Sequence, residues 1–477
     1  MTSTQSRREF LRAMGGLAAA TCSRATPLNM SLATSLAGVA AMAAQSSHAA
    51  DLSGGYKALV CVFLHGGNDS HNWIVPTDAS GYADYAAARR ELAWPTNKLL
   101  PLTTSGQATG RSFGMPTDLA ALHRWYEAGT AAAIANVGPM SRPTTKLDFQ
   151  SGRALPPKLF SHNDQASIWQ SLSPEGAHSG WGGRMGDVLM AANSYPVFTA
   201  VSVTGNAVFL TGSSTTQYQV GPEGPVTIDG LKTNGLWGST AASAALKRAL
   251  ANPGADPMQA EYVRVLQRGI GANGLLQSAL SSTAAPPIPS TPVTLGNGST
   301  LTLDNDTLAR QLKMVAQLVK AGQTMGMRRQ VFMVSMSGFD SHTGQMRDQP
   351  SLMARVALSI DYFLTALTGM GMLNNVTLFT ASEFGRTLLS NGAGSDHGWG
   401  SHHIVAGGAV RGRNIHGRFP ATTLGGPDDV GSGRLLPAYS VSQVAAPLAR
   451  WMGLTATEVS TVLPDIGNFD AGALSFI

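Results

Sequence analysis

The chain has 477 residues, of which 43% are apolar and only 13% are charged, so it can bury a large core and is not globally disordered. Its formal net charge is +5, and no run of lysine and arginine interleaved with aromatic residues occurs, which argues against a nucleic-acid-binding protein. The two cysteines, Cys22 and Cys61, provide no disulfide framework.

The N-terminal segment has the pattern of an export signal. Arg7 and Arg8 precede a Phe-Leu pair, as in a twin-arginine signal, and a weakly apolar stretch rich in glycine, alanine and leucine follows. Small residues up to Ala49 suit a signal peptidase, so we expect residues 1–49 to be removed. The expected partner is the twin-arginine translocase, and the expected location is the bacterial periplasm or the exterior. The alternative is an amphipathic N-terminal helix of the folded protein.

Short apolar runs alternate with helical patterns along the rest of the chain. This order predicts an α/β fold with a mainly parallel central sheet, mixed at its edges, and helices on both faces. The expected strands are residues 58–64, 131–137, 197–203, 330–336, 376–380 and 403–406. The expected helices are residues 117–128, 258–280, 307–325, 351–367 and 441–452.

We expect residues 50–477 to form a single domain. Within it, residues 281–300 are rich in proline, serine, threonine and glycine and predict a linker or a long surface loop. The longest apolar stretch, residues 352–373, contains Arg355 and Asp361, so it predicts an amphipathic helix and no membrane span in the mature chain.

Potential ligands follow the first and a later strand, at the edge where open α/β sheets bind their ligands. His65 and two glycines lead to Asp69, a carboxylate suited to a hard cation, although an Asx turn formed by Asp69 is the alternative. Asp340 and His342 stand two residues apart in an extended loop, so both can reach one cation; a purely structural pair is the alternative.

Two further motifs follow the strand at residues 376–380. Glu383 is a candidate ligand and Arg386 a candidate group for binding an anionic oxygen, with an internal salt bridge between them as the alternative. The strongest signal is a glycine-rich loop that carries a carboxylate and three imidazoles. This donor set favours Zn, Mn or Fe over Ca or Mg. Its members are Asp396, His397, His402 and His403.

The segment from Ser161 to Asp164 places a hydroxyl and an imidazole, His162, at an expected helix start. A serine there lies beside free backbone N–H groups, which suits a nucleophile acting on anionic esters, while simple helix capping by Ser161 is the alternative. With His71, which follows Asp69 closely, seven of the eleven histidines fall within these segments, which favours one shared metal site over separate structural roles.

Taken together, four motifs resemble the exported family called domain of unknown function 1501. They are His65-Gly-Gly-Asn-Asp69, Gly338-Phe-Asp-Ser-His342, Ser382-Glu-Phe-Gly-Arg386 and Asp396-His-Gly-Trp-Gly-Ser-His-His403. The segment from Ser440 to Leu454 also fits that family. The resemblance implies a fold related to the alkaline phosphatase and sulfatase superfamily, whose members hold one or two metals at the carboxyl edge of the sheet.

The same resemblance implies roles for individual residues. Asp69 would match the superfamily's first-strand aspartate, and Asp340 with His342 would match its Asp…His pair at a shorter spacing. Glu383 and Phe384 stand where the superfamily usually has an Asp-His pair, so one imidazole is missing there. His397 either replaces it or matches the superfamily's late histidine. Ser161 is the expected nucleophile.

The leading hypothesis is a metal-dependent hydrolase that acts on small phosphate or sulfate esters with one or two divalent metal ions. The alternative is a non-catalytic metal-binding or assembly protein that retains the fold. A serine esterase with His65-Gly-Gly as its oxyanion loop is disfavoured, because the chain has no Gly-x-Ser-x-Gly motif.

Overall fold

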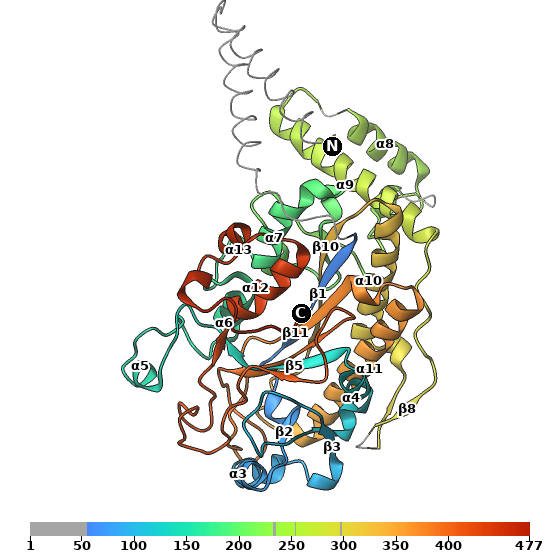
Figure 1. Cartoon of the computed structure of the whole chain (residues 1–477). Helices are drawn as coiled ribbons and strands as arrows, with labels where there is room; N and C mark the ends of the chain where they lie inside the picture. Colours follow the sequence, from blue (N-terminus) through green and yellow to red (C-terminus); the bar gives the residue numbers. More distant parts are fainter. Residues whose placement is uncertain (1–54, 232–234, 253, 296–297) are drawn as a thin grey trace, which may run out of the picture. The chain divides into compact units, whose positions relative to one another are not determined.

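A computed structural model describes residues 55–477, except 232–234, 253 and 296–297 (Figure 1). The predicted leader, residues 1–49, therefore lies outside the described residues. The part of the chain that is described belongs to one compact unit.

A nine-stranded mixed sheet forms the centre of this unit, in the order β13-β5-β12-β11-β1-β10-β6-β7, with β14 also paired to β5. All pairs are parallel except those that β12 forms with β11 and with β5. The strands are β1 (Lys57–His65), β5 (Ala131–Gly138), β6 (Ala200–Ser202), β7 (Tyr218–Gln219), β10 (Arg329–Ser337), β11 (Val376–Ala381), β12 (Ser401–Ala406), β13 (Ile415–His416) and β14 (Tyr439–Ser440).

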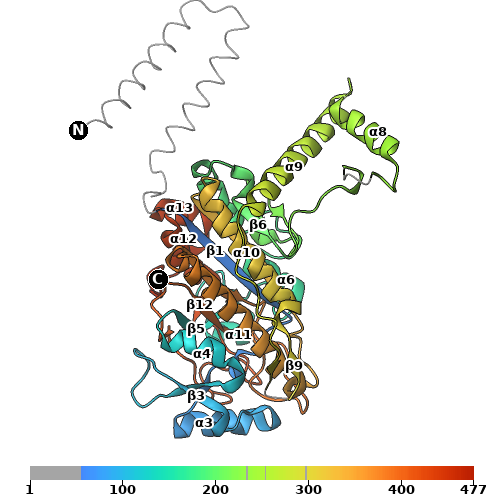
Figure 2. The ribbon, with the colours of Figure 1, turned by 90° about the vertical axis from the view of Figure 1, so that its right-hand side faces the viewer.

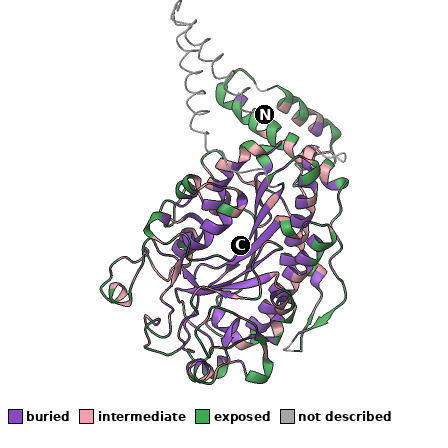
Figure 3. Cartoon of the chain, viewed as in Figure 1, coloured by how far each residue is buried: buried purple, intermediate pink, exposed green. Residues whose placement is uncertain are grey.

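Helices cover both faces of the sheet, because its inner strands are apolar on both sides (Figures 1 and 3). In β1 every residue from Ala58 to Leu64 is buried. One layer contains α4 (Ala120–Glu127), α10 (Thr307–Thr324) and α11 (Gln345–Gly369), and the opposite layer contains α6 (His162–Ser171), α7 (Trp181–Leu189), α12 (Val441–Met452) and α13 (Ala456–Val462). Two further helices, α8 (Thr240–Ala251) and α9 (Pro257–Ser281), follow β7.

The predicted fold class, α/β with a mainly parallel sheet and helices on both faces, is confirmed. The predicted strand at residues 197–203 shortens to β6, because a 3-10 turn that begins at Pro196 and ends at Phe198 takes its first two residues. The loop expected at residues 281–300 contains strand β8 (Val293–Thr294), which pairs with β9 (Thr300–Leu301).

Among the described residues one helix, α11, is long and apolar enough to cross a membrane by length and composition. However, 61% of its apolar window is buried within the fold, as in a core helix. Its charges are also paired, since Arg355 Nε lies 2.6 Å from Asp306 and Asp361 accepts a hydrogen bond from Trp125 at 2.7 Å.

Candidate metal site at the carboxyl edge of the sheet

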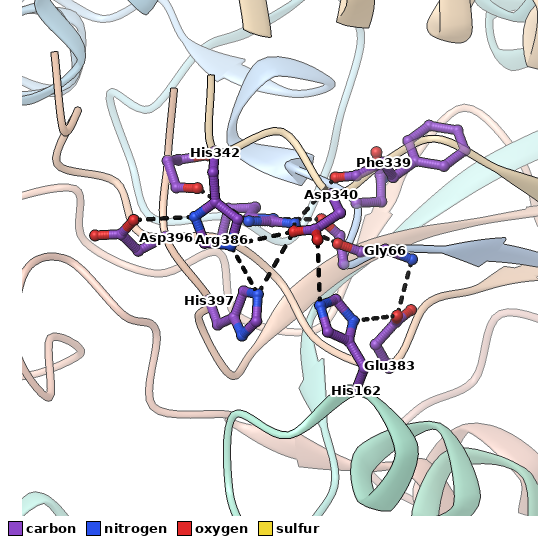
Figure 4. Close-up of polar contacts among 12 residues, drawn as sticks. Gly66, His162, Phe339, Asp340, His342, Glu383, Arg386, Asp396 and His397 are labelled. Carbon is purple, nitrogen blue, oxygen red and sulfur yellow. Dashed lines mark hydrogen bonds and ion pairs between the residues drawn. The ribbon is translucent and has the colours of Figure 1, made fainter. Parts of the chain in front are cut away.

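Six predicted residues converge beyond the carboxyl ends of β1, β10 and β11 (Figure 4). Because parallel strands end at the same edge, the loops after β10 and β11 meet there, and the loop before the antiparallel β12 returns to the same edge. Helix α6 contributes its first residue to the cluster. The cluster residues are His162, Asp340, His342, Glu383, Asp396 and His397.

Gly66 lets the loop after β1 pass directly against the loop after β10. Its φ is +119°, and a Cβ there would overlap the backbone of Phe339 and Asp340, so only glycine fits. The Gly66 N–H donates to Glu383 Oε1 at 2.8 Å. Gly66 thus allows close approach between two parts of the site.

Hydrogen bonds at Nδ1 fix the orientation of two imidazoles. His397 Nδ1 donates to the Phe160 carbonyl at 2.8 Å, and His342 Nδ1 lies 3.2 Å from Asp396 Oδ1. A hydrogen bond from Asn391 lowers the pKa of Asp396, so this carboxylate accepts a hydrogen bond from His342 Nδ1. Both rings therefore carry their hydrogen on Nδ1 and turn the Nε2 lone pair toward Asp340.

His162 is oriented in the same way by Glu383. Its Nδ1 lies 2.8 Å from Glu383 Oε1, and its Nε2 lies 3.6 Å from Asp340 Oδ2. Burial raises the pKa of Glu383, but hydrogen bonds from His162 and from the Gly66 N–H outweigh this and keep it lowered. The hydrogen bond to Glu383 raises the pKa of His162. A carboxylate behind an imidazole is the usual outer partner of a metal-binding histidine.

The three Nε2 atoms and the Asp340 carboxylate thus face one another. His342 Nε2 lies 2.9 Å from His397 Nε2, and these two atoms lie 3.2 and 3.5 Å from Asp340 Oδ1. His162, Asp340 and His397 offer donor atoms that all lie within 4.8 Å of one another. Lone pairs at these separations repel each other unless a proton or a cation lies among them.

The donor set fits a divalent transition metal. Metal–nitrogen distances of about 2.0–2.1 Å in a tetrahedral site separate the ligands by roughly 3.3 Å. The individual contacts of 2.9, 3.2, 3.5 and 3.6 Å are close to this value, whereas the group of His162, Asp340 and His397 meets only the wider limit of 4.8 Å. The side chains of His162, Asp340, His342 and His397 are between 24% and 49% exposed, so a solute can reach them. Burial lowers the pKa of His397, which favours the neutral, metal-binding form of this ring.

Arg386 has a different place from the one predicted. Its side chain is fully buried and donates to the carbonyls of Gly67 at 2.8 Å and Ser395 at 2.9 Å, and also to Asp340. Burial raises the pKa of Asp340, but Arg386 outweighs this and holds it below its usual value. Arg386 therefore ties the loops together and positions Asp340, and the predicted contact with a substrate oxygen has to be revised.

Asp69 does not join the cluster, and its predicted role as a metal ligand has to be revised. Its carboxylate is fully buried, paired with Arg89 and hydrogen-bonded to Gln345, and it accepts the His71 N–H at 3.2 Å. Burial raises the pKa of Asp69, but the Arg89 charge and these hydrogen bonds outweigh burial and hold the pKa below its usual value. The charge that a metal would neutralise is already balanced by Arg89.

His402 cannot offer its lone pair to a metal. Its Nδ1 accepts the backbone N–H of Asn136 at 3.0 Å, so the ring hydrogen is on Nε2, which has no hydrogen-bond partner. His403 is buried against Trp169, with ring centroids 4.8 Å apart. His65 packs on Phe63. These three histidines form none of the contacts that join the cluster.

Burial of His403 makes stability sensitive to acid. Burial lowers its pKa to about 3, so below about pH 6.5 the unfolded chain binds a proton that the folded chain excludes. Stability is therefore lost as the pH falls from about 6.5 toward 3. His403→Phe should flatten the pH dependence of the unfolding free energy by about 1.4 kcal/mol per pH unit in this range, measured by urea denaturation. An unchanged slope would contradict a neutral buried ring.

Ser161 is the N-cap residue of α6, next to His162 in the chain. Its hydroxyl makes no capping hydrogen bond and instead donates to Asp164 Oδ2 at 2.9 Å. Asp164 is buried and lies 3.5 Å from Lys158 Nζ. The simple capping alternative is therefore not what the structure shows, and the nucleophile assignment stays a prediction.

Two features of the site carried no sequence signal. The carbonyl of Phe160 that orients His397 belongs to the backbone, so the residue type at position 160 does not indicate its role. Arg434 is half-buried, donates to the His397 carbonyl at 2.8 Å and lies over the Phe160 ring at 5.2 Å. It comes from a glycine-rich turn without any recognisable motif.

Comparison with known proteins gives one family match. Residues 290–463 match the family model described as a protein of unknown function, DUF1501. No curated protein matches. The resemblance predicted from the four motifs is confirmed over residues 290–463, which contain three of the four.

Similar solved structures include a sulfatase from Pseudoalteromonas sp., 9% identical, covering 89% of this chain and 73% of its own, with a TM-score of 0.34. Another is from Bacteroides thetaiotaomicron and is described under the metabolism of multiple glycosaminoglycans. It is 8% identical, the match covers 86% of this chain and 74% of that one, and the TM-score is 0.32. At these values the likeness has no bearing on activity. The chain is thus identified as similar to the DUF1501 family over residues 290–463.

Proposed function

We propose that this chain is an exported metal-binding protein and a metal-dependent hydrolase of small phosphate or sulfate esters. The observation that supports the proposal is the convergence of three imidazole Nε2 atoms on Asp340, each ring being held from behind by an oxygen acceptor. His162, Asp340, His342 and His397 would hold one Zn, Mn or Fe ion. When bound, such an ion supplies Lewis-acid chemistry toward an ester oxygen.

The chain's own groups support binding of an anionic ester in two ways. Glu383, Asp396 and the Phe160 carbonyl keep the imidazoles in one orientation, so the site needs little reorganisation. Arg434, fixed beside His397, adds a positive charge near the cluster that the buried Arg386 cannot offer to a solute.

A second candidate is a non-catalytic metal-binding or assembly protein. Two observations favour it: Arg386 is enclosed by backbone carbonyls, and the Ser161 hydroxyl is engaged with Asp164. Metal analysis of protein purified from the periplasm, followed by a screen of phosphate and sulfate esters, separates the two candidates. Metal without turnover of any ester would favour the second.

The nucleophile is tested by Ser161→Ala. If Ser161 attacks the ester, the variant keeps its metal but loses at least about 1000-fold in kcat, because no other group replaces the nucleophile. Metal content by mass spectrometry and turnover of the best ester from the screen are measured on the same preparation. Full turnover with unchanged metal would remove only the Ser161 assignment.

Export is tested at the leader. Replacing Arg7 and Arg8 together by lysine should block transfer to the periplasm, because the translocase recognises the arginine pair. Cell fractionation and immunoblotting would show only precursor in the cytoplasm. Mature protein in the periplasm of this variant would contradict the twin-arginine assignment.

A further inference from the structure

The outer half of helix α9 exposes an apolar stripe. Met258 is 83% exposed, Tyr262 is 65% exposed and Val265 is 51% exposed. Helices α8 and α9 stand clear of the sheet (Figure 2), and much of their ribbon is coloured as exposed in Figure 3. Several large apolar side chains exposed on one helix face suggest a binding surface.

The spacing of the stripe is that of a coiled coil. Met258, Tyr262, Val265, Gly269 and Ala272 are separated alternately by four and three residues, which is the a/d pattern of a heptad repeat. The next position, Leu276, is buried in the main core. The same seam thus packs inside the molecule at one end of α9, and at the other end its side chains are exposed among the described residues.

An open groove of about 790 Å³ adjoins this face and meets the stripe at Val265 and Gly269. Ile270 of α9 also lines it, and Val226 and Ile228 line it from the preceding segment. Val226 is 73% exposed. No charged side chain lines the groove within the described residues, so it suits an apolar helix face.

We propose that this face binds the same face of a second copy of the chain, with the two α9 helices antiparallel. In this arrangement Met258 of each copy lies opposite Gly269 of the other, and Tyr262 opposite Val265. A Cβ at Gly269 would have nothing within 4 Å, so there is room for the methionine side chain. A parallel pairing would place Gly269 against Gly269 and leave a void.

Charges beside the seam complement each other only in the antiparallel arrangement. Glu261 and Arg268 occupy the same flanking heptad position, and antiparallel helices bring these positions together with opposite signs. Within one chain Glu261 lies 2.9 Å from Arg268 and 3.1 Å from Arg264. The same three side chains can therefore form a symmetric ion-pair network across the two-fold axis.

Disulfide trapping tests the proposal with the mature protein. Met258→Cys and Gly269→Cys are prepared separately, and Cys61 does not interfere because it is buried. A 1:1 mixture under mild oxidation should form a disulfide-linked dimer on a non-reducing gel. Either variant alone should form less than about a tenth as much, because its two cysteines would lie roughly 16 Å apart along the helix axis. Equal cross-linking in all three samples, or none, would overturn the antiparallel pairing.

A charge exchange provides the control. Sedimentation of the wild-type protein should show a dimer whose dissociation constant rises at least about tenfold in Glu261→Arg and in Arg268→Glu. The double exchange should restore dimerisation, since it reverses both charges together. A wild-type protein that stays monomeric at about 100 µM, or a monomer that instead binds anionic phosphatidylglycerol vesicles through this face, would overturn the proposal.

Discussion

Asp340→Asn is expected to purify with less than about a tenth of an equivalent of transition metal, against about one equivalent in the wild-type protein. Asp340 is the one carboxylate that all three imidazoles face, so the substitution removes the charge of the only anionic ligand in the set. The amide has nearly the shape of the carboxylate, and Arg386 keeps its four carbonyl partners, so the fold should persist.

The loss of metal should also lower the melting temperature by several degrees when excess metal is present. A ligand that binds only the folded state at about 1000 times its dissociation constant adds roughly 4 kcal/mol of stability. Asp396→Asn should weaken metal binding by only about 10- to 100-fold, because Asp396 acts through His342. Asp256→Asn is a matched control, since asparagine caps helix α9 as well as aspartate does. Wild-type metal content in Asp340→Asn would refute the site.

The second large effect is expected at Asp69. Asp69→Asn should lower the free energy of unfolding by about 3–5 kcal/mol, because it leaves the fully buried Arg89 without its counter-ion. The variant should keep its metal, which separates a structural role of Asp69 from the ligand role that its position after β1 predicts. Urea denaturation and metal analysis are measured together.

Two further variants sharpen this test. Asp78→Asn removes a partly exposed pair with Arg111 and should cost less than about 1 kcal/mol. Arg89→Met combined with Asp69→Asn should recover much of the lost stability, since neither buried charge remains. Loss of metal in Asp69→Asn at full stability would restore Asp69 to the ligand set.

The sheet could be predicted from the sequence more completely than the site. Periodicity located β1, β10 and β11 nearly residue by residue, because strands buried on both faces are continuous apolar runs. It was less accurate at residues 197–203, where a turn that begins at Pro196 takes the first two residues of the apolar segment. The antiparallel direction of β12 had no signal in the sequence, since it depends on how the loop before it returns.

For the site, residue type and position after a strand were sufficient to select most of the cluster. They were not sufficient to separate ligands from structural charges, because Asp69 and Arg386 have the same chemistry as ligands and differ only in their partners. His402 likewise differs from His397 only in which ring nitrogen is already occupied. Such distinctions depend on contacts between segments far apart in the chain.

That separation along the chain has a consequence for how the protein would acquire its metal. His162 and Glu383 are 221 residues apart, and His342 and His397 are 55 residues apart, so no short segment carries the complete donor set. The donors come together only when the sheet has formed and its loops are closed, which places metal capture after folding. Under the proposed export of the folded protein, the ion would be selected from the cytoplasmic pool, and the metal content of the periplasm would have little influence on which ion the mature protein carries.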